Sequence, residues 1–199
     1  MKNRFDYFLL NKPYGVLSQF TSEAGHRSLK DFGPFPKHVY SVGRLDADSE
    51  GLLLLTNDNK LKHGLTTPAF RHERTYLVQV EGIPTESSLQ KLREGISIND
   101  LVTLPAKAQL LHLEPLLPPR PIAIRIRKNI PTSWVEIILM EGRNRQIRKM
   151  TAAVGHPTLR LVRTHISFLS IDGLLPGESR RLTNGEISQL AEITQGPEK

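Results

Sequence analysis

The stretch Gly43-Arg44-Leu45-Asp46-Ala47-Asp48-Ser49-Glu50-Gly51-Leu52-Leu53-Leu54-Leu55 says most about the fold of this 199-residue chain. Its four leucines, with turn residues on either side, predict a strand buried on both faces of a sheet. The loop before them is bracketed by glycines and carries an arginine and a carboxylate two residues apart. A charged loop anchored on an apolar strand holds an ionised group in one geometry, as catalysis requires. The alternative is a surface loop whose acidic residues only keep the turn soluble.

The composition is that of a globular protein, with 38% hydrophobic and 24% charged residues. A chain of this length forms one large domain or two small lobes. The absence of cysteine excludes disulfides, thiolate metal sites and thiol nucleophiles. No apolar stretch approaches the length of a membrane span, and the run at residues 7–10 is too short for a signal peptide. We therefore expect a cytoplasmic protein.

Positive charge is concentrated in one part of the chain. The net charge is +7, and residues 120–163 hold ten basic residues but only two acidic ones, so the remainder is close to neutral. A basic face on a near-neutral body indicates a polyanionic partner, nucleic acid first. Most of these residues are arginines, whose planar guanidinium pairs well with phosphate. The alternative is an ordinary solvated run of charge.

The predicted strands and helices follow one another irregularly, which indicates an α+β fold with a mixed, mostly antiparallel sheet. Alternating hydrophobic residues, helix caps and turn residues place these elements. We predict strands at residues 5–10, 52–55, 74–81, 133–140 and 158–166, a turn at 11–15, and helices at 59–65, 86–94, 142–154 and 186–193. Residues 113–122 include four prolines and are predicted to form an extended loop.

The third predicted helix begins with several arginines. Its N-terminal amides and positive dipole end, flanked by Arg143 and Arg145, predict an anion site. Arg148 lies beside the predicted buried stripe of this helix, where its charge needs a carboxylate partner. Asp46 is the candidate, and the pairing would keep that carboxylate ionised at neutral pH. The alternative is that Arg148 is one more phosphate-binding arginine on the surface.

Other familiar site patterns are missing or incomplete. The seven histidines have no metal-ligand spacing, and no P-loop, dinucleotide or nucleophile-elbow motif occurs. Asp46, Asp48 and Glu50 imitate the opening of a calcium-binding loop, but its twelfth position is Asn57 instead of glutamate. We expect no metal site, with calcium kept as an alternative.

Five blocks of sequence, in order along the chain, resemble the RsuA-type pseudouridine synthases, the ribosomal RNA branch of these enzymes. They are Asn11-Lys12-Pro13-Tyr14-Gly15-Val16, residues 43–58, Tyr76 within residues 74–78, residues 141–150 and residues 155–163. Within this family the chain is most similar to the RluE-like members, which modify 23S ribosomal RNA. That finer match rests on residues 48–50, residues 130–134 and the proline-containing loop.

The resemblance implies a pseudouridine synthase fold, with two lobes around a catalytic cleft, and isomerisation of a flipped-out uridine in RNA without a cofactor. It implies that Asp46 is the catalytic carboxylate, as nucleophile or base, that Tyr76 stacks on the uracil, and that Arg148 pairs with Asp46. It also implies that Arg44 contacts the RNA at the flipped nucleotide. Together with the basic segment, this predicts RNA contacts by seven basic residues, namely Lys12, Arg44, Arg143, Arg145, Lys149, Arg160 and Arg163.

Most RsuA-type enzymes carry a small N-terminal S4 RNA-binding domain, whereas here the catalytic block begins within the first ten residues. We therefore expect residues 1–199 to form a single catalytic domain without S4, acting as a monomer on 23S ribosomal RNA. The basic segment at residues 120–163 would hold the RNA, with binding sensitive to salt and to local RNA shape. The alternatives are a catalytically silent RNA-binding or ribosome-assembly protein, and a synthase that acts on small-subunit or transfer RNA.

Overall fold

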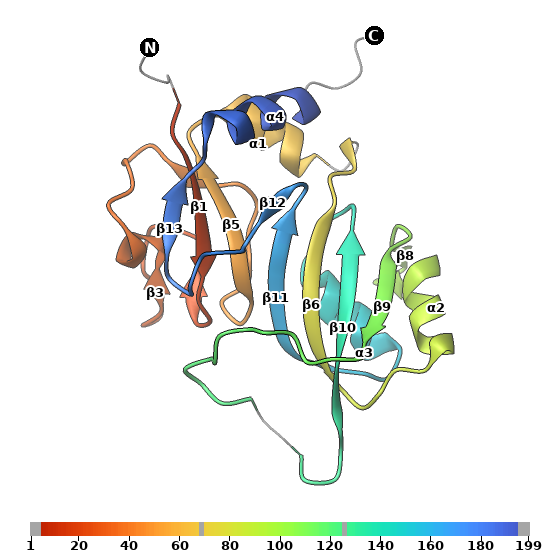
Figure 1. Ribbon diagram of the computed structural model, residues 1–199. Helices are drawn as coiled ribbons and strands as arrows, with labels where there is room; N and C mark the ends of the chain where they lie inside the picture. Colours follow the sequence, from red (N-terminus) through yellow and green to blue (C-terminus); the bar gives the residue numbers. More distant parts are fainter. Residues whose placement is uncertain (1–4, 68–69, 125–126, 195–199) are drawn as a thin grey trace. The chain divides into compact units, whose positions relative to one another are not determined.

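The chain divides into two compact α+β units, one comprising the residues up to His72 and from Phe168 onward, the other Glu73–Ser167. The computed structural model describes residues 5–67, 70–124 and 127–194 (Figure 1). None of the helices in these ranges has the length and apolar character needed to cross a membrane.

The first unit contains an antiparallel sheet, a pair of short parallel strands and two α-helices. Its elements are β1 (Tyr7–Lys12), β2 (Val16–Leu17), β3 (Arg27–Ser28), the 3-10 helix η1 (Leu29–Phe32), β4 (Tyr40–Ser41), β5 (Glu50–Thr56), α1 (Asn59–Thr66), β12 (Leu169–Ser170), β13 (Ser179–Arg181) and α4 (Asn184–Thr194). Strand β1 lies between β13 and β5, and β4 also pairs with β5, each pair being antiparallel. Strands β2 and β3 form a parallel pair.

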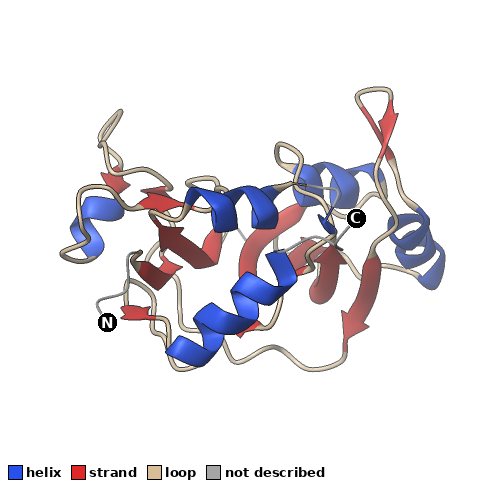
Figure 2. Ribbon diagram, turned by 90° about the horizontal axis from the view of Figure 1, so that it is seen from above, coloured by secondary structure: helices blue, strands red, loops and turns tan. Residues whose placement is uncertain are grey.

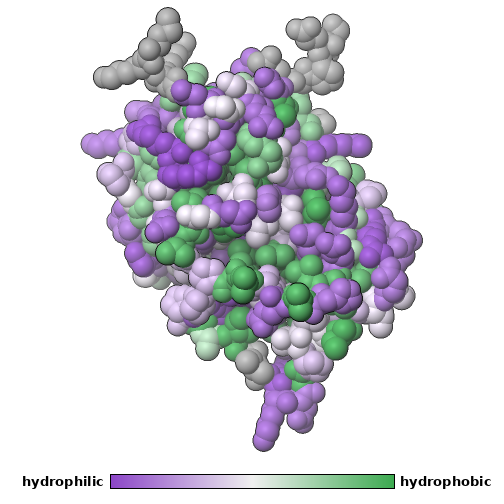
Figure 3. Space-filling model, viewed as in Figure 1, coloured by the Kyte–Doolittle hydropathy of each residue, from purple (hydrophilic) through white to green (hydrophobic). Residues whose placement is uncertain are grey.

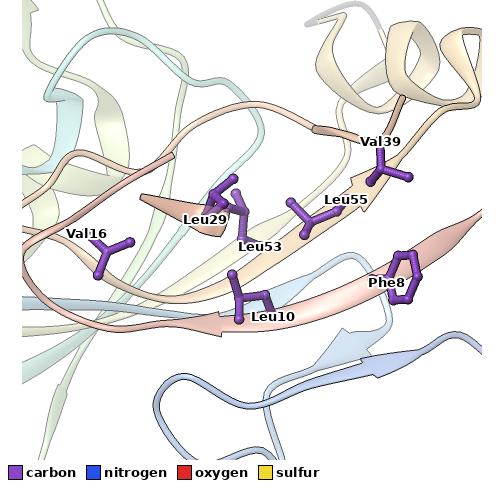
Figure 4. Packing of buried hydrophobic residues seen from close by; sticks show 7 residues of the cluster. All are labelled: Phe8, Leu10, Val16, Leu29, Val39, Leu53 and Leu55. Atoms are coloured by element: carbon purple, nitrogen blue, oxygen red, sulfur yellow. The ribbon is translucent and has the colours of Figure 1, made fainter. Parts of the chain in front are cut away.

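Strand β5 is buried along its whole length, as its leucines predict. Leu53 and Leu55 face one core, together with Phe8 and Leu10 of β1 (Figure 4). The segment between the two strands covers this core with Val16, Leu29 and Val39. The other leucines of β5 point to the opposite face, because side chains alternate along a strand, and they are equally buried. Burial on both faces makes β5 a firm support for the loop that precedes it.

Asp58 begins helix α1 directly after β5. One of its carboxylate oxygens accepts hydrogen bonds from two amides of the first turn, and the other accepts the Tyr7 hydroxyl at 2.8 Å. Burial and this hydrogen bond raise the pKa of the Tyr7 phenol. Helix α1 packs against α4 (Figure 1, and from above in Figure 2). A Cβ atom at Gly64 would lie 2.6 Å from that of Thr194, so the close approach requires glycine.

The second unit contains a four-stranded antiparallel sheet in the order β11-β6-β10-β9. Its elements are β6 (Arg74–Glu81), α2 (Glu86–Glu94), β7 (Ser97–Ile98), β8 (Leu101–Val102), β9 (Lys107–Leu111), β10 (Thr132–Leu139), α3 (Gln146–Ala153) and β11 (Thr158–Ile166). The alternation along β6 and the α2 caps at Thr85 and Gly95 confirm the predictions. Most of the strand pairs in the two units are antiparallel, and one pair, β2 with β3, is parallel. This confirms the predicted mixed, mostly antiparallel strand pairing.

Several predicted boundaries differ from the structure; β5, for example, begins at Glu50, two residues before its first leucine. Strand β1 runs on to Lys12, which pairs with Gly51, although turn residues follow immediately. Helix α3 begins only at Gln146, because Arg145 has a left-handed backbone with φ +51°. Helix α4 begins two residues earlier than predicted, at Asn184. The predicted loop at residues 113–122 is confirmed, since it contains neither helix nor strand.

The first turn of α4 is held by a reciprocal cap. The Thr183 amide donates to the Glu186 carboxylate at 2.7 Å, and the Glu186 amide donates to the Thr183 hydroxyl at 3.2 Å. Arg180 donates to both carboxylate oxygens, at 2.9 and 2.7 Å. The Arg180 hydrogen bonds outweigh partial burial and lower the pKa of Glu186 from 4.5 to about 2.

We predict that Glu186→Gln lowers the free energy of unfolding at neutral pH and that this effect disappears in acid. The folded-state pKa is depressed, so the carboxylate stabilises the fold above pH 4.5, and this contribution is lost as the pH falls from 4.5 to about 2. Urea unfolding of the wild type and the variant, at neutral pH and at the acidic end of this range, measures the effect. The control is Glu192→Gln, an exposed residue of the same helix. A Glu186→Gln effect of equal size at both pH values contradicts the prediction.

Candidate active site

The loop that joins β4 to β5 carries Asp46 and is tied to β5 through its backbone. The Val42 amide donates to the Leu54 carbonyl at 2.8 Å, and the Ser49 amide donates to the Asp46 carbonyl at 3.0 Å. Gly43 has φ +70°, a left-handed conformation that favours glycine. Asp46 is therefore the first residue of a closed turn that leads directly into the buried strand.

A buried serine holds the residue before Asp46. The Ser18 hydroxyl donates to the Leu45 carbonyl at 2.7 Å and accepts from the Leu45 amide at 3.0 Å. The Ser41 hydroxyl donates in turn to the Ser18 carbonyl at 3.1 Å. The sequence analysis missed Ser18, because nothing in the sequence marks a contact between residues 27 positions apart.

The turn after β1 supports the same loop. The Gly15 amide donates to the Ala47 carbonyl at 2.7 Å. The Lys12 ammonium group donates to the carbonyls of Pro13 at 3.0 Å and Val16 at 2.8 Å, and the side chain is fully buried. A side chain without solvent access does not reach RNA in this conformation. Lys12 therefore holds the turn, and its predicted RNA contact is corrected to a structural role.

Three charged side chains of the Asp46 loop remain accessible, because Arg44 is exposed and both Asp46 and Asp48 are partly exposed. Glu50, in contrast, is buried within β5. A calcium-binding loop needs twelve residues of irregular backbone around the ion, so the start of β5 at Glu50 excludes the calcium alternative here. Within the described ranges, no group of three histidine, aspartate or glutamate residues is suited to hold a metal.

In the second unit, Tyr76 lies in the middle of β6, paired with Arg163 of β11 and Ile137 of β10. Both Tyr76 and Arg163 are buried. Burial lowers the pKa of Arg74; Tyr76 opposes this shift, and like-charge repulsion from Arg163 adds to it. Tyr76 therefore lies near two arginines. The sequence analysis missed Arg74, although its spacing of two from Tyr76 places both on one face of the strand.

Helix α3 carries Arg148, which is half-buried and donates to the Thr158 carbonyl at 3.5 Å, the long end of hydrogen bonding. Its predicted ion pair with Asp46 joins residues of different units and stays a prediction. Lys149 is partly exposed, and Arg145 is exposed at the start of the helix. Arg145 and Lys149 therefore remain accessible candidates for RNA contact.

Arg143 belongs to a network around the buried carboxylate of Glu141. The Leu104 amide and the Gln146 side-chain amide donate to Glu141 Oε1 at 2.8 and 2.7 Å, and Arg143 Nε donates to Oε2 at 3.0 Å. Arg143 Nη2 also donates to the Val102 carbonyl at 2.9 Å. Arg143 thus fixes the β7–β8 hairpin to the residues before α3. Arg143 and Arg145 both precede α3, and the predicted anion site at the start of this helix stays a prediction.

The two arginines of β11 that were predicted to bind RNA are both buried. Arg160 donates through Nη2 to the Pro118 carbonyl at 2.9 Å, and Arg163 lies opposite Tyr76. Arg160 therefore holds the residues between β9 and β10 and does not face solvent. Of the predicted RNA-binding residues, Arg44, Arg143, Arg145 and Lys149 keep the accessibility that a phosphate contact needs.

The sequence matches the model of the RNA pseudouridylate synthase family over residues 6–153. It is 54% identical over 170 residues to the ribosomal large subunit pseudouridine synthase E of Xanthomonas axonopodis pv. citri (strain 306), covering 84% of this chain and 89% of that protein. It is 49% identical over 175 residues to the synthase of the same name from Vibrio vulnificus (strain CMCP6), covering 88% and 74%. A crystal structure of a pseudouridylate synthase aligns with a TM-score of 0.77 at 32% identity, covering 94% of this chain and 74% of that one.

The chain therefore belongs to the RNA pseudouridylate synthase family. It has the pseudouridine synthase fold, as the sequence resemblance implied. It is an RNA pseudouridine synthase, an isomerase that converts uridine within RNA to pseudouridine.

We predict that Ser18→Ala lowers the free energy of unfolding by about 1–3 kcal/mol, because it leaves the buried amide and carbonyl of Leu45 without these hydrogen bonds. Chemical denaturation of the variant measures this loss. Ser41→Ala is the matched control, since it removes a single hydrogen bond from the same cluster. If Ser18→Ala is no less stable than Ser41→Ala, the hydroxyl of Ser18 does not hold the loop.

Proposed function

We propose that the protein isomerises a specific uridine of large-subunit 23S ribosomal RNA and that Asp46 is the catalytic carboxylate. Two relatives that share about half of its sequence are named as large-subunit pseudouridine synthases. The observation that best supports the residue assignment is the closed turn at Asp46, tied to β5 and to Ser18. Such a turn keeps a carboxylate in one place without help from the substrate.

The reaction needs a carboxylate and no co-reactant. The glycosidic bond of the uridine breaks, the uracil turns, and its C5 atom bonds to the ribose carbon that it left. The C5 proton leaves and the former glycosidic nitrogen takes up a proton, so atoms and electrons balance. A carboxylate beside the electron-poor ribose carbon assists as a nucleophile, or it removes a proton as a base. Asp46 fits either role, because it is partly exposed and fixed in a turn.

We assign Tyr76 and Arg148 to the same reaction. Tyr76 is an aromatic side chain in a basic environment, since Arg74 and Arg163 both lie near it. An aromatic ring among arginines suits a flipped base, because the ring stacks on the base and the positive charges attract the phosphates of its strand. Arg148 is half-buried, and a charge that is partly withdrawn from water favours a carboxylate partner.

We predict that Asp46→Asn abolishes pseudouridine formation, with a loss of about a hundredfold or more, because the amide neither attacks carbon nor accepts a proton at neutral pH. The assay uses purified enzyme and 23S ribosomal RNA transcribed without modifications. Asp48→Asn is the matched control, with the same change of charge two residues further along the same turn. RNA binding of both variants is measured in parallel, so that a loss of RNA binding is not mistaken for a loss of catalysis.

Each outcome of this assay has a definite meaning. Product from the wild type and Asp48→Asn, but none from Asp46→Asn, supports both parts of the proposal. Equal product from all three enzymes removes Asp46 from the reaction. If the wild type modifies a transfer RNA or 16S transcript but not 23S RNA, the proposed substrate is wrong, although the assignment of Asp46 still holds if its variant is inactive there.

A further inference from the structure

The connection between β9 and β10 is far longer than the sheet requires. These strands are antiparallel neighbours, which a loop of about 2–5 residues suffices to join. Here 20 residues, 112–131, separate Leu111 from Thr132, and those described form neither helix nor strand. We call residues 112–131 the proline-rich loop. Loops of such length in a compact unit are usually functional or disordered.

Contacts with other residues of the second unit hold the proline-rich loop in place. Arg160 donates from its buried guanidinium to the Pro118 carbonyl at 2.9 Å. Arg127 lies 3.4 Å from the Glu81 carboxylate, measured from Nε to Oε1. The Gly82 amide donates to the carbonyl of Pro131 at 2.7 Å. Five prolines in the loop restrict its backbone further, so less conformational entropy is lost when it binds a partner.

The held loop presents large apolar side chains to solvent. Leu113 is 83% exposed, Leu116 is fully exposed and Ile122 is 58% exposed. Figure 3 shows hydrophobic residues gathered on the lower part of the visible face, where Figure 1 shows this loop crossing the second unit. Exposed leucines scattered singly are normal, whereas several on one anchored loop indicate a contact surface.

The charge of the proline-rich loop indicates which partner this surface takes. Its sequence holds four basic residues and a single acidic one, Glu114. Arg120 donates to the carbonyls of Ile122 and Ala123 at 2.7 and 3.3 Å, which keeps a cation beside an exposed apolar side chain. Unpaired RNA offers the matching chemistry, since the faces of its bases are apolar and pack against such side chains, and its phosphates attract arginine.

We propose that the proline-rich loop is a second RNA-contact surface, which binds unpaired nucleotides of the substrate outside the reactive uridine through Leu113 and Leu116. This proposal rests on the proposed function for the identity of the RNA and adds an element that holds it. Arg160 is a positioning residue in this scheme. It acts through the Pro118 carbonyl and does not itself contact a nucleotide. The buried Arg160, predicted from its residue type to bind RNA, would thus support RNA binding by holding the loop.

The test is the double variant Leu113→Ser, Leu116→Ser, with unmodified 23S ribosomal RNA transcript as the probe. We expect the Kd for the transcript to rise about tenfold, from the loss of two apolar contacts. The salt dependence of log Kd should stay unchanged, because no phosphate contact is removed. The unfolding midpoint should also stay unchanged, because both side chains are exposed. Leu101→Ser, a similarly exposed leucine on the β7–β8 hairpin, is the control and should bind as the wild type does.

A double variant that binds the transcript as tightly as the wild type overturns the proposal. It is also overturned if RNA binding is intact but association with ribosomal particles is lost, since the surface then takes a protein. Turnover by the wild type in the same samples reports on the proposed function separately. If the wild type binds the transcript but forms no pseudouridine, the proposed function fails, while a raised Kd of the double variant still supports the loop as an RNA contact.

Discussion

The two hydrogen bonds between the Ser18 hydroxyl and the backbone of Leu45 are the constraint on which the proposed chemistry depends. They fix the residue before Asp46, while the Ser49 amide closes the turn behind it. The turn continues into β5, whose seven residues are all buried and leave the strand little freedom to move. Chemistry at a flipped uridine demands a carboxylate in one position, and here backbone hydrogen bonds to a buried framework supply that position.

Several buried charged groups in this protein hold loops and do not face a ligand. Lys12 holds the turn after β1, Arg160 holds the proline-rich loop, and Glu141 accepts hydrogen bonds from three residues. Burying such charges is favourable only when they are hydrogen-bonded, so each of them ties its loop firmly to the core. The basic segment thus divides into internal residues that shape the loops and exposed residues, such as Arg145, that are accessible to phosphate.

Periodic patterns predicted the framework well, because they report burial directly. The leucines of β5 and the alternation of β6 gave the correct strands. The start of α3 was missed because helix propensity does not report the left-handed backbone that Arg145 adopts. Arg160 was predicted to bind RNA because residue type reveals charge but not burial. Ser18 was not predicted because its hydrogen bonds to Leu45 form only when two loops that are distant in the sequence come together in the fold.

Amide hydrogen exchange at Leu45, followed by NMR in the RNA-free protein, measures most directly whether the Asp46 loop is formed before substrate binds. We predict that this amide is protected about as strongly as the amide of Leu54 within β5, and that Ser18→Ala removes the protection of Leu45 while leaving Leu54 protected. Exchange at Leu45 as fast as at the fully exposed Leu116 would show that the loop is not held, and that Asp46 is positioned by something other than this framework.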